Sequence, residues 1–243
     1  MAALLSGCIK ASPTLTIKAD GSGSLDVNYS ISEASINQMK AMTKLKQQMA
    51  LASGSALSDV DDDFVTLMMD PDEKKIKTRA EKYKYLGISL IKLNINARNG
   101  WRFVEIRLTF SAINKLAQAD FFPENGFNLT RRHDGSYLLY KPAAKPRDTR
   151  VPDAIPDGKE LAFLAPIMSG FTVNIKFETP GRVIDTNGLV KGLNNAEWKF
   201  DFDQNPDALT RLQQQDFRII FDGKSLTLPD VQMEKQTASD GKS

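Results

Sequence analysis

The sequence is poor in the residues from which most catalytic and metal centres are built. Its 243 residues include one cysteine, Cys8, and one histidine, His133. A single cysteine cannot form an intramolecular disulfide, and one cysteine with one histidine cannot supply the ligands of a zinc site. The G-x-S-x-G, P-loop and G-x-G-x-x-G motifs do not occur either. The sequence therefore predicts a non-catalytic protein without a metal or cofactor.

An envelope hydrolase remains an alternative function class. The 30 Asp and Glu residues offer many carboxylate pairs for a glycosidase, but the sequence does not give their separation in space. A serine hydrolase would have to use His133, and no pattern places a serine and an acid beside it. We therefore keep the hydrolase as a third hypothesis, after two binding functions.

The chain also lacks a charge excess and a long apolar run. Its 32 Lys and Arg against 30 Asp and Glu leave a net charge of +2, so no global field predicts nucleic-acid binding. No apolar stretch reaches the ~18–20 residues of a membrane span. The apolar content of 41% is enough for a core. We expect one domain over residues 13–230, with a mobile excursion at 141–158 and a disordered tail at 231–243.

Residues 1–12 are expected to be a truncated signal and tether. Leu5-Ser6-Gly7-Cys8 resembles the lipobox of bacterial lipoproteins, in which Cys8 would carry the lipid. Only seven residues precede Cys8, fewer than the ~15–30 of a secretory signal. Either the true start lies upstream or the match is chance. Lipidation would anchor the protein in the cell envelope, on the outer side of the cytoplasmic membrane or in the outer membrane.

Alternating apolar residues predict strands along most of the domain. Two hairpins are expected, over residues 15–30 and 127–141, and a helix should run from Ser32 to about residue 51. Further strands are expected at residues 171–177, 182–185, 198–202 and 217–221. Trp198 alternates with Phe200 and Phe202, which predicts a core position. The pattern indicates an α+β fold: a mostly antiparallel β-sheet of about eight to ten strands, with helices packed mainly on one face.

The clearest local prediction is the hairpin over residues 91–110. Asn99-Gly100 suits a two-residue type I′ turn, which sets the register of both strands. That register pairs Ile95 with Val104, Leu93 with Ile106, and Ile91 with Leu108. Trp101 and Phe103 then lie on the opposite, charged face, where they are candidate contacts for a ligand or partner.

A second pair of aromatic residues, Phe121 and Phe122, stands at the entry to a loop. With Trp101 and Phe103 they form the set of candidate ligand or partner contacts. The alternative is that they have no binding role and are isolated exposed aromatics, which are common on protein surfaces.

Two turn-rich parts of the chain resemble a known family. Thr179-Pro180-Gly181-Arg182-Val183, Asp185-Thr186-Asn187-Gly188 and the strand centred on Trp198 are similar to the domain of the mycobacterial LppM-type lipoproteins. The opening strand pair with its Asp20-Gly21-Ser22-Gly23 turn is similar too. The resemblance implies an envelope-anchored protein that binds lipid and has no catalytic site.

Two binding functions follow from these observations. In the first, the protein binds lipid or another amphipathic envelope ligand between sheet and helices, which requires an enclosed apolar cavity. In the second, a structural or assembly lipoprotein docks a partner protein, which requires an exposed apolar patch on a solid core.

Overall fold

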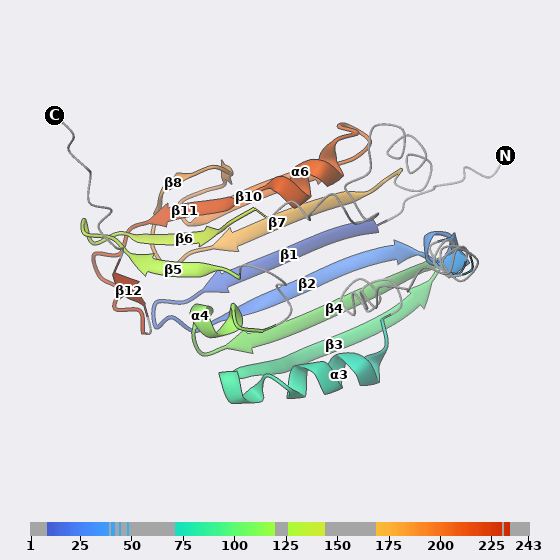
Figure 1. Ribbon diagram of the computed structural model, residues 1–243, viewed down its shortest axis with the longest axis horizontal. Coiled ribbons are helices and arrows are strands. Elements are labelled where there is room, and N and C mark those ends of the chain that lie inside the picture. The colour runs from blue at the N-terminus through green and yellow to red at the C-terminus, as the bar shows by residue number, and fades with distance from the viewer. Residues whose placement is uncertain are drawn as a thin grey trace.

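The chain folds into two stacked β-sheets with short helices around them (Figure 1). The computed structural model describes residues 9–38, 40, 41, 44, 48, 71–119, 126–143, 169–229 and 231–233. A seven-stranded sheet, the large sheet, has the order β3-β4-β2-β1-β7-β10-β9, and a five-stranded sheet, the small sheet, has the order β12-β5-β6-β11-β8.

The strands of the large sheet are β1 (Ile9–Ile17), β2 (Gly23–Ser32), β3 (Ile88–Arg98), β4 (Trp101–Phe110), β7 (Thr172–Glu178), β9 (Leu189–Val190) and β10 (Asn195–Asp201). Those of the small sheet are β5 (Asn128–Arg131), β6 (Tyr137–Lys141), β8 (Val183–Thr186), β11 (Phe217–Phe221) and β12 (Gln232–Met233). β1 begins at Ile9 and β12 ends at Met233, so parts of the segments expected to be tether and tail belong to the sheets.

The strands form two sheets, which corrects the expectation of a single sheet, and each sheet contains one parallel pairing among mostly antiparallel ones. β1 pairs with β7 in parallel, as β12 does with β5, whereas the other described pairings are antiparallel. No short turn connects β1 to β7, because more than 150 residues separate the two strands, so the sequence contains no local signal of their pairing. Local alternation therefore predicted the strands but not the way in which they assemble.

The β3–β4 hairpin follows the predicted register near its turn and leaves it farther away. Asn99 and Gly100 both have positive φ, at 53° and 72°, as a type I′ turn requires. Ile95 pairs with Val104 and Leu93 with Ile106, as predicted. The third pair is wrong, because a bulge between Leu90 and Lys92 places Leu90 opposite Leu108. Ile91 is displaced by the bulge and is 61% exposed.

The core lies between the two sheets and is filled by aromatic side chains. Trp198 of β10 is 6% exposed, as expected for a core residue. Its indole packs edge-on against Phe177 of β7 and Phe217 of β11, with ring centroids 5.3 and 5.1 Å apart. Phe127, just before β5, also packs edge-on against Phe177, with ring centroids 5.2 Å apart. Rings from both sheets thus interlock at this end of the molecule.

A helix follows β2, as predicted from Ser32 onward. Its described residues, 33–38, 40, 41, 44 and 48, are all helical, and the Ser32 hydroxyl caps them by accepting from the Ser35 N–H at 3.1 Å. The others are α3 (Glu73–Glu81), the 3₁₀ helix η1 (Lys84–Leu86), α4 (Ile113–Leu116) and α6 (Ala208–Gln214). Figure 1 shows α3 beside the edge strand β3 and α6 at the other side, near β10 and β7. That the helices share one face stays a prediction.

Among the described residues, no helix is both long and apolar enough to span a membrane.

Candidate functional site

The outer face of the large sheet, turned away from the small sheet, carries two of the predicted contact residues. Trp101 and Phe103 both point to this face from β4 and are half-buried. A cation lies near each ring: Lys10 Nζ is 5.7 Å from the Trp101 centroid, and the Arg98 guanidinium is 4.6 Å from the Phe103 centroid. Such cation–π contacts hold long cationic side chains against aromatic surface.

The other predicted site residues, Cys8, Phe121 and Phe122, lie outside the described ranges. The structure therefore brings Trp101 and Phe103 together with two cations, Lys10 and Arg98, that were not predicted as contact residues. Cys8 directly precedes Ile9, the first residue of β1.

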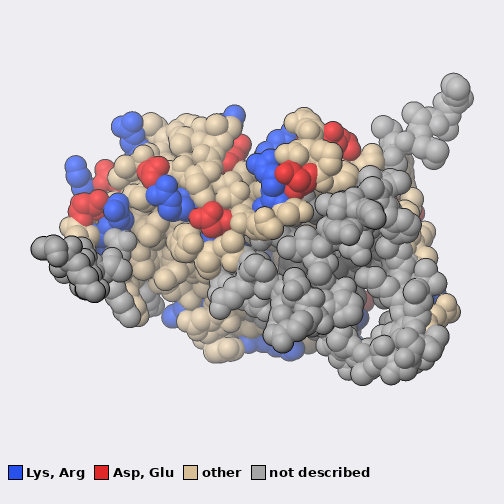
Figure 2. All heavy atoms as spheres, turned by 45° about the horizontal axis from the view of Figure 1, so that its top comes forward, with Lys and Arg blue, Asp and Glu red and all other residues tan. Residues whose placement is uncertain are grey.

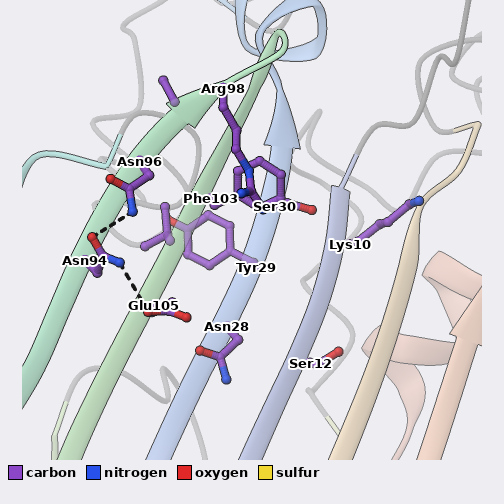
Figure 3. A pocket seen from close by; sticks show the side chains of 12 residues that line it. Lys10, Ser12, Asn28, Tyr29, Ser30, Asn94, Asn96, Arg98, Phe103 and Glu105 are labelled. Carbon is purple, nitrogen blue, oxygen red and sulfur yellow. Dashed lines mark hydrogen bonds between the residues drawn. The ribbon is translucent and has the colours of Figure 1, made fainter.

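A shallow groove of about 600 Å³ crosses β1, β2, β4 and β3 on this outer face (Figure 3). Alternation along the strands places amides and hydroxyls there, because every second residue of a strand points to the same side. The groove is open to solvent and has charged, polar and aromatic walls. Its polar and charged side chains are Lys10, Ser12, Asn28, Ser30, Asn94, Asn96, Arg98 and Glu105.

A row of hydrogen bonds orders the β3–β4 wall of the groove. The Asn96 amide donates to Asn94 Oδ1 at 2.9 Å, and the Asn94 amide donates to Glu105 Oε2 at 3.3 Å. Lys92 pairs with the same carboxylate oxygen at 2.8 Å. The hydrogen bond from Lys92, followed by that from Asn94, lowers the pKa of Glu105. Glu105 therefore stays ionised at neutral pH and serves as an acceptor on the groove wall.

A second hollow, of about 540 Å³, continues the same polar face toward the β1–β2 turn. Opposite charges are paired in it: Arg107 bonds Asp26, and Lys176 bonds Glu178 at 2.6 Å. The Thr16 hydroxyl also donates to Glu178 at 3.0 Å. These pairs engage four of the five charged side chains of the second hollow, all except Lys18. The groove that Phe103 lines is therefore the better candidate for a binding site.

The groove can bind a polar ligand by hydrogen bonding and by charge. Its amides both donate and accept, its hydroxyls do the same, and Lys10 and Arg98 attract anionic groups. The chain's one histidine, His133, is exposed in the turn between β5 and β6 and does not line the groove. Within the described ranges, no group of three or more His, Cys, Asp or Glu could hold a metal ion.

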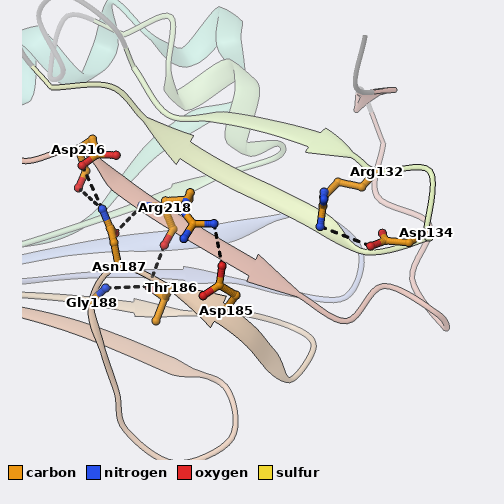
Figure 4. A network of polar contacts seen from close by, with 8 residues as sticks. All are labelled: Arg132, Asp134, Asp185, Thr186, Asn187, Gly188, Asp216 and Arg218. Carbon is orange, nitrogen blue, oxygen red and sulfur yellow. Dashed lines mark hydrogen bonds and ion pairs between the residues drawn. The ribbon is translucent and has the colours of Figure 1, made fainter. Parts of the chain in front are cut away.

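The motif that resembles the LppM-type domain is a structural clamp (Figure 4). Asn187 holds β11 at both polar ends of its amide, because Nδ2 donates to the Asp216 carbonyl at 3.1 Å and Oδ1 accepts from the Arg218 N–H at 3.0 Å. Thr186 donates to the Arg218 carbonyl at 2.8 Å, and Asp185 pairs with the Arg218 guanidinium at 2.7 Å. These hydrogen bonds and this ion pair fasten β8 and the turn after it to β11.

Two glycines of this motif are required by close packing. A Cβ on Gly188 would lie 2.5 Å from the Trp198 indole, and a Cβ on Gly181 would lie 1.9 Å from the Asp222 carbonyl oxygen. The Thr179 hydroxyl closes the first turn by donating to the Gly181 carbonyl at 2.8 Å. The turn residues of this motif are therefore explained by their roles in packing and hydrogen bonding within the fold.

A set of exposed apolar side chains on the same segment was not predicted from the sequence. Ile184 on β8 is 60% exposed, and Leu193 in the loop after β9 is 68% exposed. β8 and β9 are the edge strands of the small and large sheet, so this segment closes one side of the sandwich. The full set is Ile184, Leu189, Val190 and Leu193. Apolar residues around Gly192 in a turn-rich stretch were the signal that could have revealed it.

Charges of both signs are interspersed over the described surface seen in Figure 2. This face therefore shows no single-sign field of the kind that would attract nucleic acid.

Comparison with known proteins shows no family for this chain but gives likenesses among solved structures. No protein-family model matches the sequence, and no curated protein matches it. Among solved structures, the chain is similar to the folded domain of the Mycobacterium tuberculosis LppM protein, determined by NMR, at 13% identity and over 89% of this chain and 90% of that one. The TM-score is 0.37, and at that value the likeness carries no argument about this chain.

Proposed function

We propose that this chain is a non-catalytic lipoprotein of the cell envelope, anchored through Cys8, that binds the polar part of an amphipathic ligand in the groove on the outer face of the large sheet. The observation that carries the proposal is the composition of the groove: amides, hydroxyls, two cations and an ionised carboxylate line it beside Phe103. A ligand with polar groups next to apolar surface matches that combination.

The location of the site differs from the initial expectation of a lipid held between sheet and helices. The groove is open and polar rather than enclosed and apolar. Where the two sheets face each other, the aromatic rings of Trp198, Phe177 and Phe217 fill the space between them. The outer face is therefore the better place for the ligand.

A second candidate function is docking of a partner protein, and a separate observation favours it. Ile184, Leu189, Val190 and Leu193 expose apolar side chains on a segment that hydrogen bonds hold firmly to β11. Exposed apolar groups in a fixed arrangement are typical of protein interaction sites.

Metabolic labelling with an alkyne fatty acid, in a host that supplies a complete upstream signal, tests the anchor. The wild-type chain should be labelled and a Cys8→Ser variant should not. Equal labelling of both chains would refute acylation at Cys8.

Native mass spectrometry of the protein extracted from its own envelope tests the ligand site. A co-purifying small molecule is expected with the wild type and should be lost from an Asn94→Ala/Asn96→Ala variant. Asn128→Ala is the matched control, because Asn128 is an exposed asparagine on β5 of the other sheet. A bare wild-type protein, or the same ligand on all three, would count against the groove. Capture of a partner that is lost in Leu189→Ser/Leu193→Ser would favour docking instead.

A further inference from the structure

The end of the large sheet at which β1 begins is fixed close to Cys8. β1 starts at Ile9, the residue that follows Cys8, so no linker separates the proposed lipid anchor from the sheet. Ile9 lies opposite Ile31 on β2, and the next residue of β2, Ser32, lies opposite Trp101 on β4. Trp101 is therefore level with the start of β1 and two strands away, about 10 Å across the sheet.

Cations accompany Trp101 at this end. Lys10, two residues after Cys8, contacts the Trp101 ring with its ammonium at 5.7 Å. Arg98 ends β3 and lies over Phe103, and Arg102 lies opposite Ile31. Figure 3 shows Arg98, Phe103 and Lys10 toward the end of the sheet where β1 begins, with Glu105 and Ser12 farther along the strands. We call this set, Lys10, Arg98, Trp101, Arg102 and Phe103, the anchor end.

Acidic groups at the same end are few or are already engaged. Glu33 is exposed next to the β3–β4 turn, where its N–H donates to the Gly100 carbonyl at 2.9 Å. Asp201 pairs with Lys199 at 3.0 Å, and Asp203 accepts from the Gly170 N–H at 2.9 Å. Because a backbone N–H does not neutralise a carboxylate, Glu33 and Asp203 keep their negative charge at this end. Among the described residues, the three cations of the anchor end outnumber these two acids.

We propose that the anchor end lies against the surface of an anionic bilayer, with Trp101 at the level of the lipid headgroups. This inference rests on the proposed anchoring of the chain through Cys8. Tryptophan favours the membrane interface, because its ring is apolar and its N–H is polar, and cations near it are attracted to anionic lipid. The attraction falls off within a Debye length of about 8–10 Å, so it acts on this end of the sheet and not on the other.

This orientation places the groove beside the bilayer. Lys10, Arg98 and Phe103 belong both to the anchor end and to the groove wall. The open side of the groove then adjoins the headgroup layer, where the polar part of an amphipathic molecule resides.

Tryptophan fluorescence in vesicles tests the orientation. The acylated chain is incorporated into phosphatidylglycerol vesicles whose acyl chains carry bromine, which quenches nearby indoles. Strong quenching is expected in the wild type and little in Trp101→Phe, because the remaining Trp198 is 6% exposed in the core. Equal quenching in both chains would overturn the proposal.

A co-sedimentation experiment tests the contact without the lipid anchor. The Cys8→Ser chain should bind phosphatidylglycerol vesicles better than phosphatidylcholine vesicles, and a further Lys10→Ala change should weaken this binding about fivefold. Lys18→Ala is the matched control, because Lys18 is exposed at the opposite end of β1, about 26 Å away. No preference for anionic vesicles, or an equal loss with both lysine variants, would overturn the proposal.

The proposed lipid anchor at Cys8 and the proposed contact of the anchor end with the bilayer can be refuted independently. Absence of an acyl group at Cys8 would refute the anchor, while the co-sedimentation experiment would still decide whether the anchor end binds anionic lipid.

Discussion

Replacing Trp198 by alanine should destabilise the protein far more than the same change at the other tryptophan. Trp198 is 6% exposed and packs edge-on against Phe177 and Phe217, which come from different sheets. Truncation of a buried tryptophan costs about 3–5 kcal/mol from lost burial and the cavity left behind. Each lost aromatic contact adds about 0.5–1.5 kcal/mol beyond the buried area, which favours the upper part of that range.

One feature of Trp198 opposes this cost. Its indole N–H is buried and has no hydrogen-bond partner in the part of the chain that the structure describes. Removing a buried donor without a partner removes a desolvation penalty of about 1–3 kcal/mol. The net loss should therefore stay near 3–5 kcal/mol rather than exceed it.

Thermal and denaturant melts measure the effect. For a chain of this size, a loss of 3–5 kcal/mol lowers Tm by roughly 6–20 °C. Trp101→Ala, which removes a half-buried ring from the outer face, should cost under about 1 kcal/mol. A loss below about 1 kcal/mol for Trp198→Ala, or a larger loss for Trp101→Ala, would refute the assignment of Trp198 to the core.

Three further changes test other parts of the fold. Gly188→Ala should destabilise by about 1–3 kcal/mol in urea melts, because its Cβ would overlap the Trp198 indole; an unchanged midpoint would show that the ring moves aside without cost. Asn187→Ala should cost about 1–2 kcal/mol in the same assay through its lost bonds to β11, and a neutral result would show that the clamp contributes nothing. Burial raises the pKa of Tyr29, so its contribution to stability is complete below pH ~10 and is lost as the pH rises toward the folded pKa. Tyr29→Phe should therefore lose less stability than the wild type between pH 8 and pH 11, and parallel losses would contradict this reasoning.

Local turn chemistry explains which parts of the fold were predictable. Asn99-Gly100 determines the register of the adjoining residues, and the first two predicted pairs are present. The prediction failed at Ile91, because a bulge shifts the pairing by one residue and alternation alone does not reveal a bulge. The parallel pairing of β1 with β7 was missed because no short turn connects them.

The candidate site was harder to predict than the strands. Trp101 and Phe103 were predicted as contact residues because they fall on the polar side of a hairpin, and the structure shows them half-buried there. The amides of Asn28, Asn94 and Asn96 look like ordinary solvent-facing residues when each strand is considered alone. They become one groove wall only when β2, β3 and β4 lie side by side, an arrangement that rests on contacts distant in sequence.

The central position of β1 has a mechanical consequence. β1 is hydrogen-bonded along its length to β2 on one side and to β7 on the other. A pull transmitted through the backbone just before Ile9 acts along the strand axis, so it loads both ladders in shear. Many hydrogen bonds then share the force and have to break together, whereas an edge strand pulled sideways would unzip one bond at a time. The strand nearest to the proposed anchor is thus placed to resist a pull between the membrane and the folded domain.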